Sequence, residues 1–165
     1  MGPRPPLVAV CGASRPRPGD LLAAREAGRL LADRGWPVLC GGLGGVMGAV
    51  AEGAAAAGGL VIGLLPGDDP RDGDPACTVA LATGLGEGRN LLLVRAASAV
   101  LAIGGGLGTL TEVALALRLG RPVAGIGTWR LRSPAGEDET ALGLEPCADA
   151  TAALAWLATR IPTVG

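Results

Sequence analysis

The chain has 165 residues, of which 49% are hydrophobic and 18% charged, and its formal net charge is −1. This length suits one domain, covering 1–165, with one sizeable hydrophobic core. No apolar run approaches the ~18 residues of a membrane span. The arginines are scattered rather than clustered, which argues against a nucleic-acid-binding surface. The first six residues lack the apolar stretch of a secretory signal, so we expect a cytoplasmic protein without membrane or nucleic-acid partners.

Several kinds of chemistry are excluded by residue types that the chain lacks, namely histidine, lysine, phenylalanine, tyrosine and glutamine. Without histidine there is no Ser-His-Asp or Cys-His catalysis and no imidazole zinc site. Without lysine there is no Schiff base to pyridoxal phosphate and no Walker A loop. The four cysteines show no metal-ligand spacing, so we expect neither a metal nor a cofactor. Any catalysis must use carboxylates, arginines, hydroxyls and backbone amides.

Short apolar runs alternate with alanine-rich amphipathic stretches along the whole chain. The runs predict strands, which in chain order are Leu7–Cys11, Val38–Cys40, Leu60–Leu64, Val79–Ala82, Ala99–Ile103 and Val123–Ile126. The helices are predicted from Asp20 as N-cap to Gly35, from the glycines at 41–45 to 58–59, and over Asn90–Ala97, Thr109–Leu119 and Ala148–Thr159. A surface loop is expected over Pro66–Pro75 and irregular chain over 129–143.

This alternation predicts an α/β fold, a Rossmann-like parallel sheet with helices on both faces in three layers. Ligands of such sheets bind at the carboxyl ends of the strands, near the point where the strand order reverses.

Three glycine-rich turns connect predicted strand ends to helices, and they indicate a phosphate-binding site. Glycine lets the backbone approach a ligand closely, and the amides of a helix N-terminus favour an anion. Thr109 adds a hydroxyl donor. The predicted phosphate or nucleotide ligands are Gly12, Ser14, Gly42, Gly45, Met47, Asn90, Gly105, Gly106, Gly108 and Thr109.

Glu112 and Asn90 each allow two interpretations. Glu112 lies close to the presumed phosphate, where a carboxylate stabilises positive charge on a sugar ring. Thr109-x-x-Glu112 is also a capping-box pattern, in which glutamate accepts from the N-cap amide. Asn90 is the one asparagine of the chain and either contacts the ligand or caps the helix that follows.

Three segments together resemble the LONELY GUY family, long described as possible lysine decarboxylases. They are Val8-Ala9-Val10-Cys11-Gly12-Ala13-Ser14, the run Cys40-Gly41-Gly42-Leu43-Gly44-Gly45-Val46-Met47-Gly48, and Gly105-Gly106-Leu107-Gly108-Thr109-x-x-Glu112. The resemblance covers about residues 7–126. A lysine-free chain cannot anchor pyridoxal phosphate, which rules out decarboxylation by that route.

The resemblance implies a homodimer or higher oligomer that hydrolyses the N-glycosidic bond of nucleoside 5′-monophosphates, releasing a base and ribose 5-phosphate. In the family pattern, Arg89 takes the place of the catalytic arginine, Arg95 that of a second arginine and Glu112 that of the motif glutamate. Gly104 replaces the motif proline and Asn90 replaces a lysine.

These departures are more like a short branch that includes molybdenum-cofactor carrier proteins, which bind a phosphorylated pterin without hydrolysing it. Two functions therefore follow: a phosphoribohydrolase with Arg89 and Glu112 as catalytic residues, or a carrier for a phosphorylated pterin or nucleotide. Both use the same phosphate site.

Overall fold

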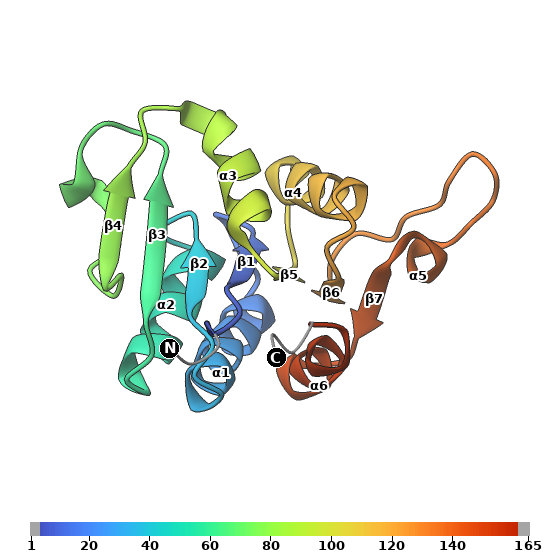
Figure 1. The fold of residues 1–165 in the computed structure, drawn as a ribbon, viewed down its shortest axis with the longest axis horizontal. Coiled ribbons are helices and arrows are strands. Elements are labelled where there is room, and N and C mark those ends of the chain that lie inside the picture. Colours follow the sequence, from blue (N-terminus) through green and yellow to red (C-terminus); the bar gives the residue numbers. More distant parts are fainter. Residues whose placement is uncertain (1–3, 162–165) are drawn as a thin grey trace.

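Seven parallel strands form one sheet in the computed structural model, which describes residues 4–161 (Figure 1). The predicted α/β fold is thus confirmed. Residues 1–3, part of the segment used to argue against a secretory signal, lie outside the described residues. The strands are β1 Val8–Gly12, β2 Val38–Cys40, β3 Val61–Leu65, β4 Val79–Ala82, β5 Ala99–Ile103, β6 Val123–Ile126 and β7 Leu144–Cys147. Their order is β4-β3-β2-β1-β5-β6-β7.

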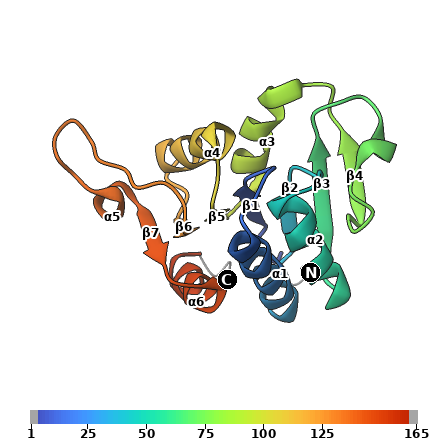
Figure 2. The same ribbon diagram turned by 180° about the vertical axis from the view of Figure 1, so that it is seen from behind.

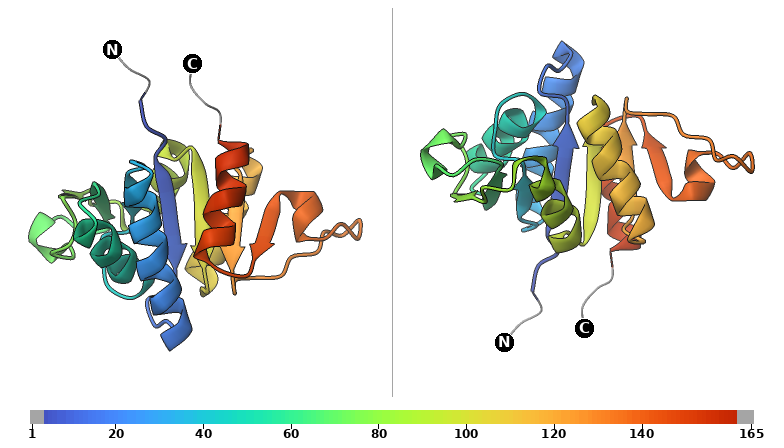
Figure 3. Two further views of the ribbon diagram at one scale, coloured as in Figure 1. Left: turned by 90° about the horizontal axis from the view of Figure 1, so that it is seen from below. Right: turned by 90° about the horizontal axis from the view of Figure 1, so that it is seen from above.

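Helices cover both faces of the sheet (Figures 2 and 3). On one face lie α1 Pro18–Asp33, α2 Val46–Ala56 and α6 Ala150–Arg160; on the other lie α3 Arg89–Ala96 and α4 Leu107–Arg118. The short helix α5 Glu139–Leu142 lies beside β7, and 3₁₀ turns span Pro70–Asp72 and Gly86–Gly88. None of the described helices is long and apolar enough to cross a membrane.

The period of two along the central strands explains why they are apolar throughout. In β1, Val8 and Val10 belong to the core cluster under α1, α2 and α6, whereas Ala9 and Cys11 belong to the cluster on the opposite face. Because successive side chains of a strand point to opposite faces, a strand covered on both sides needs an apolar residue at every position.

The strand order reverses between β1 and β5. From β1 the chain moves outward through β2, β3 and β4, and it then returns to β5 beside β1 and moves outward the other way. The chain leaves the carboxyl end of β1 toward one face of the sheet and that of β5 toward the other face. A crevice for a ligand lies between two such connections.

Two local predictions were wrong. Asp20 is not the N-cap of α1 but its third residue, and its carboxylate accepts from the backbone amide of Arg17 at 3.0 Å. The segment 129–143, expected to be irregular, contains α5, and β7 follows it. Of the four residues of β7 only Leu144 is buried, so this edge strand lacks the apolar run that identified the others.

Candidate functional site

A cavity of about 270 Å³ lies at the carboxyl ends of β1 and β5, where the strand order reverses. It is bounded by the turn after β1, by α2 and α3, and by the first two turns of α4. The residues that line it are Gly12, Ala13, Ser14, Met47, Arg89, Asn90, Gly106, Leu107, Gly108, Thr109 and Glu112. The fold thus brings together most of the predicted site from segments almost a hundred residues apart.

Three of the predicted ligands, Gly42, Gly45 and Gly105, do not line this cavity. Gly42 and Gly45 have φ of +71° and +72° in the turn after β2. A Cβ on Gly45 would lie 2.5 Å from the carbonyl oxygen of Ala13, so this glycine lets the turns after β1 and β2 pack together. Gly105 lines a neighbouring cavity described below. Direct ligand contact by these three residues stays a prediction.

The N-terminus of α4 offers backbone amides to the cavity. Gly106 is the N-cap, no side chain caps the helix, and the amides of its first turn therefore have no intrahelical acceptor. The Thr109 side chain is buried at the same place. Unsatisfied amides at the positive end of a helix dipole form a site for a phosphate or a carboxylate.

The capping interpretations of Glu112 and Asn90 are both wrong. Because α4 begins at Leu107, Thr109 is its third residue and Glu112 its sixth, three residues beyond the position that a capping-box glutamate occupies. Likewise α3 begins at Arg89 with Gly88 as N-cap, so Asn90 lies inside the helix. The Asn90 side-chain oxygen is buried without a partner among the described residues.

Glu112 is a buried carboxyl with a strongly perturbed acidity. Burial raises its pKa from 4.5 to about 7, while the positive charge of Arg89 and a hydrogen bond with the Cys11 thiol act in the opposite direction. Burial together with the nearby carboxylate raises the pKa of Cys11 well above its usual value, so this thiol stays protonated. A proton on Glu112 is therefore exchangeable near neutral pH, as a general acid requires.

Arg89 is a buried, positively charged residue of the cavity, and two of its guanidinium nitrogens have no hydrogen-bond acceptor among the described residues. The residue is 8% exposed, and the two nitrogens are its Nε and Nη1. Burial lowers the pKa of this guanidinium, and the Glu112 carboxylate opposes that change. The guanidinium lies against Gly41, where a Cβ would be 2.1 Å from Nη1. A buried, unsatisfied guanidinium facing a cavity is suited to an anionic ligand.

Arg95, the second arginine implied by the family pattern, is exposed on α3 and does not line the cavity. Its backbone carbonyl accepts from Arg121 Nη2 at 3.1 Å. Ala13 and Leu107 also line the cavity, although neither was predicted as a site residue from the sequence. Both stand inside the glycine turns identified from the sequence, so the turns themselves were the available signal.

The architecture defines a Rossmann-like α/β protein, with a cavity beside the uncapped N-terminus of α4 at the switch point of its sheet. The sequence profile of the SLOG cluster4 family (LDcluster4) matches residues 5–150, and the chain belongs to that family. An uncharacterized protein of Archaeoglobus fulgidus is 42% identical over 103 residues, which cover 62% of this chain and 68% of the relative.

Two solved structures extend the likeness over nearly the whole chain. The molybdenum cofactor binding protein of Rippkaea orientalis is 32% identical with a TM-score of 0.85, covering 96% of this chain and 99% of that one. The molybdenum cofactor carrier protein of Chlamydomonas reinhardtii is also 32% identical, with a TM-score of 0.81 over 94% and 98%. These matches support the carrier-like branch of the expected resemblance. Membership of the LONELY GUY family itself stays a prediction.

Proposed function

We propose that this protein is a binding or carrier protein for a phosphorylated pterin of the molybdenum-cofactor type. The observation that carries the proposal is the uncapped N-terminus of α4 beside the unsatisfied guanidinium of Arg89, two anion-binding features in one cavity. The whole-length likeness to two molybdenum-cofactor binding proteins supports the pterin as the organic part of the ligand.

In this proposal the phosphate lies on the amides at the start of α4 and on the Thr109 hydroxyl. Arg89, the first residue of α3, balances the negative charge of the phosphate, and Asn90 offers its unpartnered amide oxygen to the ligand. The amide oxygen is an acceptor, which suits the amino and ring N–H donors of a pterin better than a phosphate.

The test is a fluorescence titration with a phosphorylated pterin and with the same pterin after phosphatase treatment. Charge-assisted hydrogen bonds of about 1.5–3 kcal/mol each imply at least tenfold tighter binding of the phosphorylated form. Thr109→Val, which removes the buried hydroxyl, should weaken binding severalfold. Thr111→Val is the matched control on the same helix, since Thr111 is exposed and donates to the Leu107 carbonyl. Equal affinity for the two pterins would overturn the proposal.

A second candidate, the phosphoribohydrolase, is favoured by one specific observation. Arg89 and Glu112 face the same cavity, and the pKa of Glu112 lies at about 7. Such a carboxyl can stabilise a sugar cation or position water. Release of ribose 5-phosphate from a panel of nucleoside monophosphates tests this function. Loss of on the order of 10²–10³ in rate in Glu112→Gln would support it, and binding without release by the wild type would support the carrier.

A further inference from the structure

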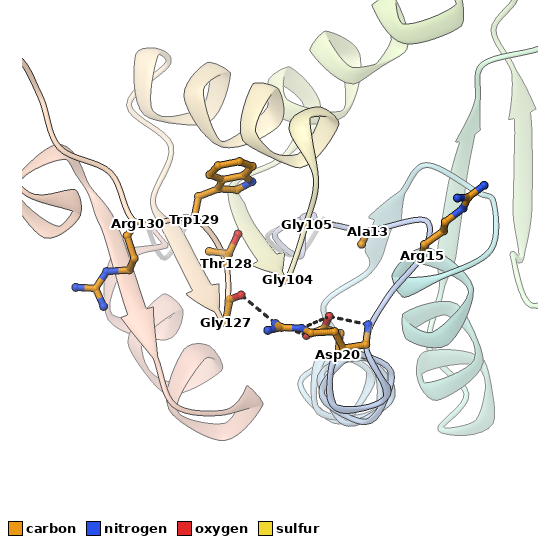
Figure 4. A pocket seen from close by; sticks show the side chains of 10 residues that line it. Ala13, Arg15, Asp20, Gly104, Gly105, Gly127, Thr128, Trp129 and Arg130 are labelled. Atoms are coloured by element: carbon orange, nitrogen blue, oxygen red, sulfur yellow. Dashed lines mark hydrogen bonds and ion pairs between the residues drawn. The ribbon is translucent and has the colours of Figure 1, made fainter.

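A second, larger cavity of about 470 Å³ lies on the other side of the glycine turn that follows β5 (Figure 4). It is built by the loops after β1, β5 and β6, so it also stands at the carboxyl edge of the sheet. Its lining residues are Ala13, Arg15, Arg17, Asp20, Gly104, Gly105, Gly127, Thr128, Trp129 and Arg130. Among the ligand and catalytic residues predicted from the sequence, Gly105 alone lines this cavity.

Positive charge predominates in this cavity. Of its three arginines, Arg17 is fixed, because it donates to both oxygens of Asp20 and to the Gly127 carbonyl. This arginine holds the pKa of Asp20 below its usual value, so the one carboxylate of the lining is already neutralised. Arg130 pairs with the buried Glu139. Arg15 has no hydrogen-bond or ion-pair partner among the described residues.

The lining also contains one unpaired polar group and three glycines with positive φ. The Thr128 hydroxyl oxygen is buried without a partner among the described residues. Gly104, Gly105 and Gly127 have φ of +57°, +121° and +56°, backbone conformations that favour glycine. The side chains of Asp20, Thr109 and Arg17 fill the space where side chains at these three positions would lie. Arg15 and Arg130 lie on opposite sides of the cavity, and in Figure 4 both exposed side chains point away from its centre. Each would have to change rotamer to contact a bound group.

The two cavities adjoin each other. Ala13 lines both, and the consecutive residues Gly105 and Gly106 line one cavity each. Because Gly105 and Gly106 are joined by one peptide bond, the two linings meet at a single peptide unit of this turn. The indole N–H of Trp129 donates to the Gly106 carbonyl at 3.1 Å and so fixes the turn between them. The first cavity, at about 270 Å³, also falls below the roughly 300–1,000 Å³ of ordinary ligand sites.

We propose that the cavity around Arg15, Thr128 and Arg130 is a second anion subsite, which takes the second phosphate of a diphosphate-containing ligand. The subsite rests on the proposed function in that the first phosphate occupies the cavity at the start of α4. It extends the ligand class from monophosphates to nucleoside diphosphates and diphosphate-linked dinucleotides. Arg15 supplies the charge that no protein group neutralises.

Calorimetry with AMP, ADP and inorganic pyrophosphate tests the subsite in the wild type and in Arg15→Ala. ADP should bind the wild type about tenfold more tightly than AMP. Arg15→Ala should remove most of that difference and leave the affinity for AMP unchanged. Arg34→Ala is the matched control: it also removes one exposed arginine, but at the far end of α1, a helix of 16 residues whose other end borders the cavity.

The outcomes separate the subsite from the proposed function. Equal affinity of the wild type for AMP and ADP would overturn the subsite and leave the first phosphate site intact. Equal losses for AMP and ADP in Arg15→Ala, or the same loss in Arg34→Ala, would also overturn it. Pyrophosphate binding that depends on Arg15, without any binding of AMP, would support the subsite and count against the proposed phosphate site. Absence of binding by all three probes would overturn the subsite, whereas the proposed function is decided by the titration with the phosphorylated pterin.

Discussion

Replacing Glu112 by glutamine removes a carboxyl group whose ionised form is destabilised by burial. Burial raises the pKa of Glu112 from 4.5 to about 7 in the folded protein. Between these two values the folded state keeps a proton that the unfolded chain has lost, so stability falls as the pH rises from about 4.5 to about 7. At about 1.4 kcal/mol for each factor of ten in proton affinity, the loss amounts to about 3 kcal/mol.

Glutamine resembles the protonated form of glutamate and has no proton to lose in this range. The wild type and Glu112→Gln should therefore be about equally stable near pH 4, and the variant should be more stable by about 3 kcal/mol at pH 8.5. Urea unfolding at both pH values measures the difference, because the titration of all other groups largely cancels between the two proteins. Glu87→Gln, at an exposed glutamate, is the control for loss of one negative charge.

Parallel stability profiles for the wild type and Glu112→Gln across this pH range would refute the reasoning. They would mean that water reaches the carboxylate, or that Arg89 compensates it fully. A gain in Glu87→Gln equal to that in Glu112→Gln would attribute the effect to net charge rather than to burial.

The other predictions concern packing and assembly. Gly104→Ala should lower the free energy of unfolding, measured with urea, by about 1–3 kcal/mol, because residue 104 has a left-handed backbone conformation. The loss should exceed that of Gly136→Ala. A Cβ at position 104 would lie 2.7 Å from Asp20 Oδ2, whereas one at position 136 would meet nothing within 4 Å. Gly41→Ala should displace the Arg89 guanidinium and weaken AMP binding, as seen by calorimetry, while circular dichroism stays that of the wild type. Light scattering at micromolar concentration should give a mass near twice the 16.2 kDa of one chain, and a sharp mass of one chain would rule out the expected dimer.

Six of the seven strands, β1 to β6, were predictable because each is a short apolar run in the sequence. A short, uninterrupted apolar run followed by glycine identifies both β1 and β5 without reference to the rest of the chain. Such a run is typical of a strand that is covered on both faces. The turns after these two strands follow from the same pattern, since glycine at a strand end permits the backbone conformations seen at Gly104 and Gly105. This combination located the first cavity.

The second cavity was not predictable because it depends on contacts between distant segments. The Arg17 side chain joins the Asp20 carboxylate to the Gly127 carbonyl, 110 residues further along the chain. No local periodicity encodes such a contact. The first residue of α4 posed a similar problem: Thr109-x-x-Glu112 fits a capping box, yet the helix begins at Leu107, and only the starting residue distinguishes the two interpretations.

Gly104 connects the sequence departure from the LONELY GUY pattern to the arrangement of the two cavities. Proline, the motif residue, fixes φ near −65°, whereas Gly104 has a φ of +57° and lies against the Asp20 carboxylate. The turn after β5 therefore follows a path that proline cannot adopt. That path brings the backbone of this turn to Asp20, and Asp20 holds Arg17 at the edge of the second cavity. A single glycine thus accompanies a turn with a cavity on each side, the arrangement that the proposed diphosphate-containing ligand requires.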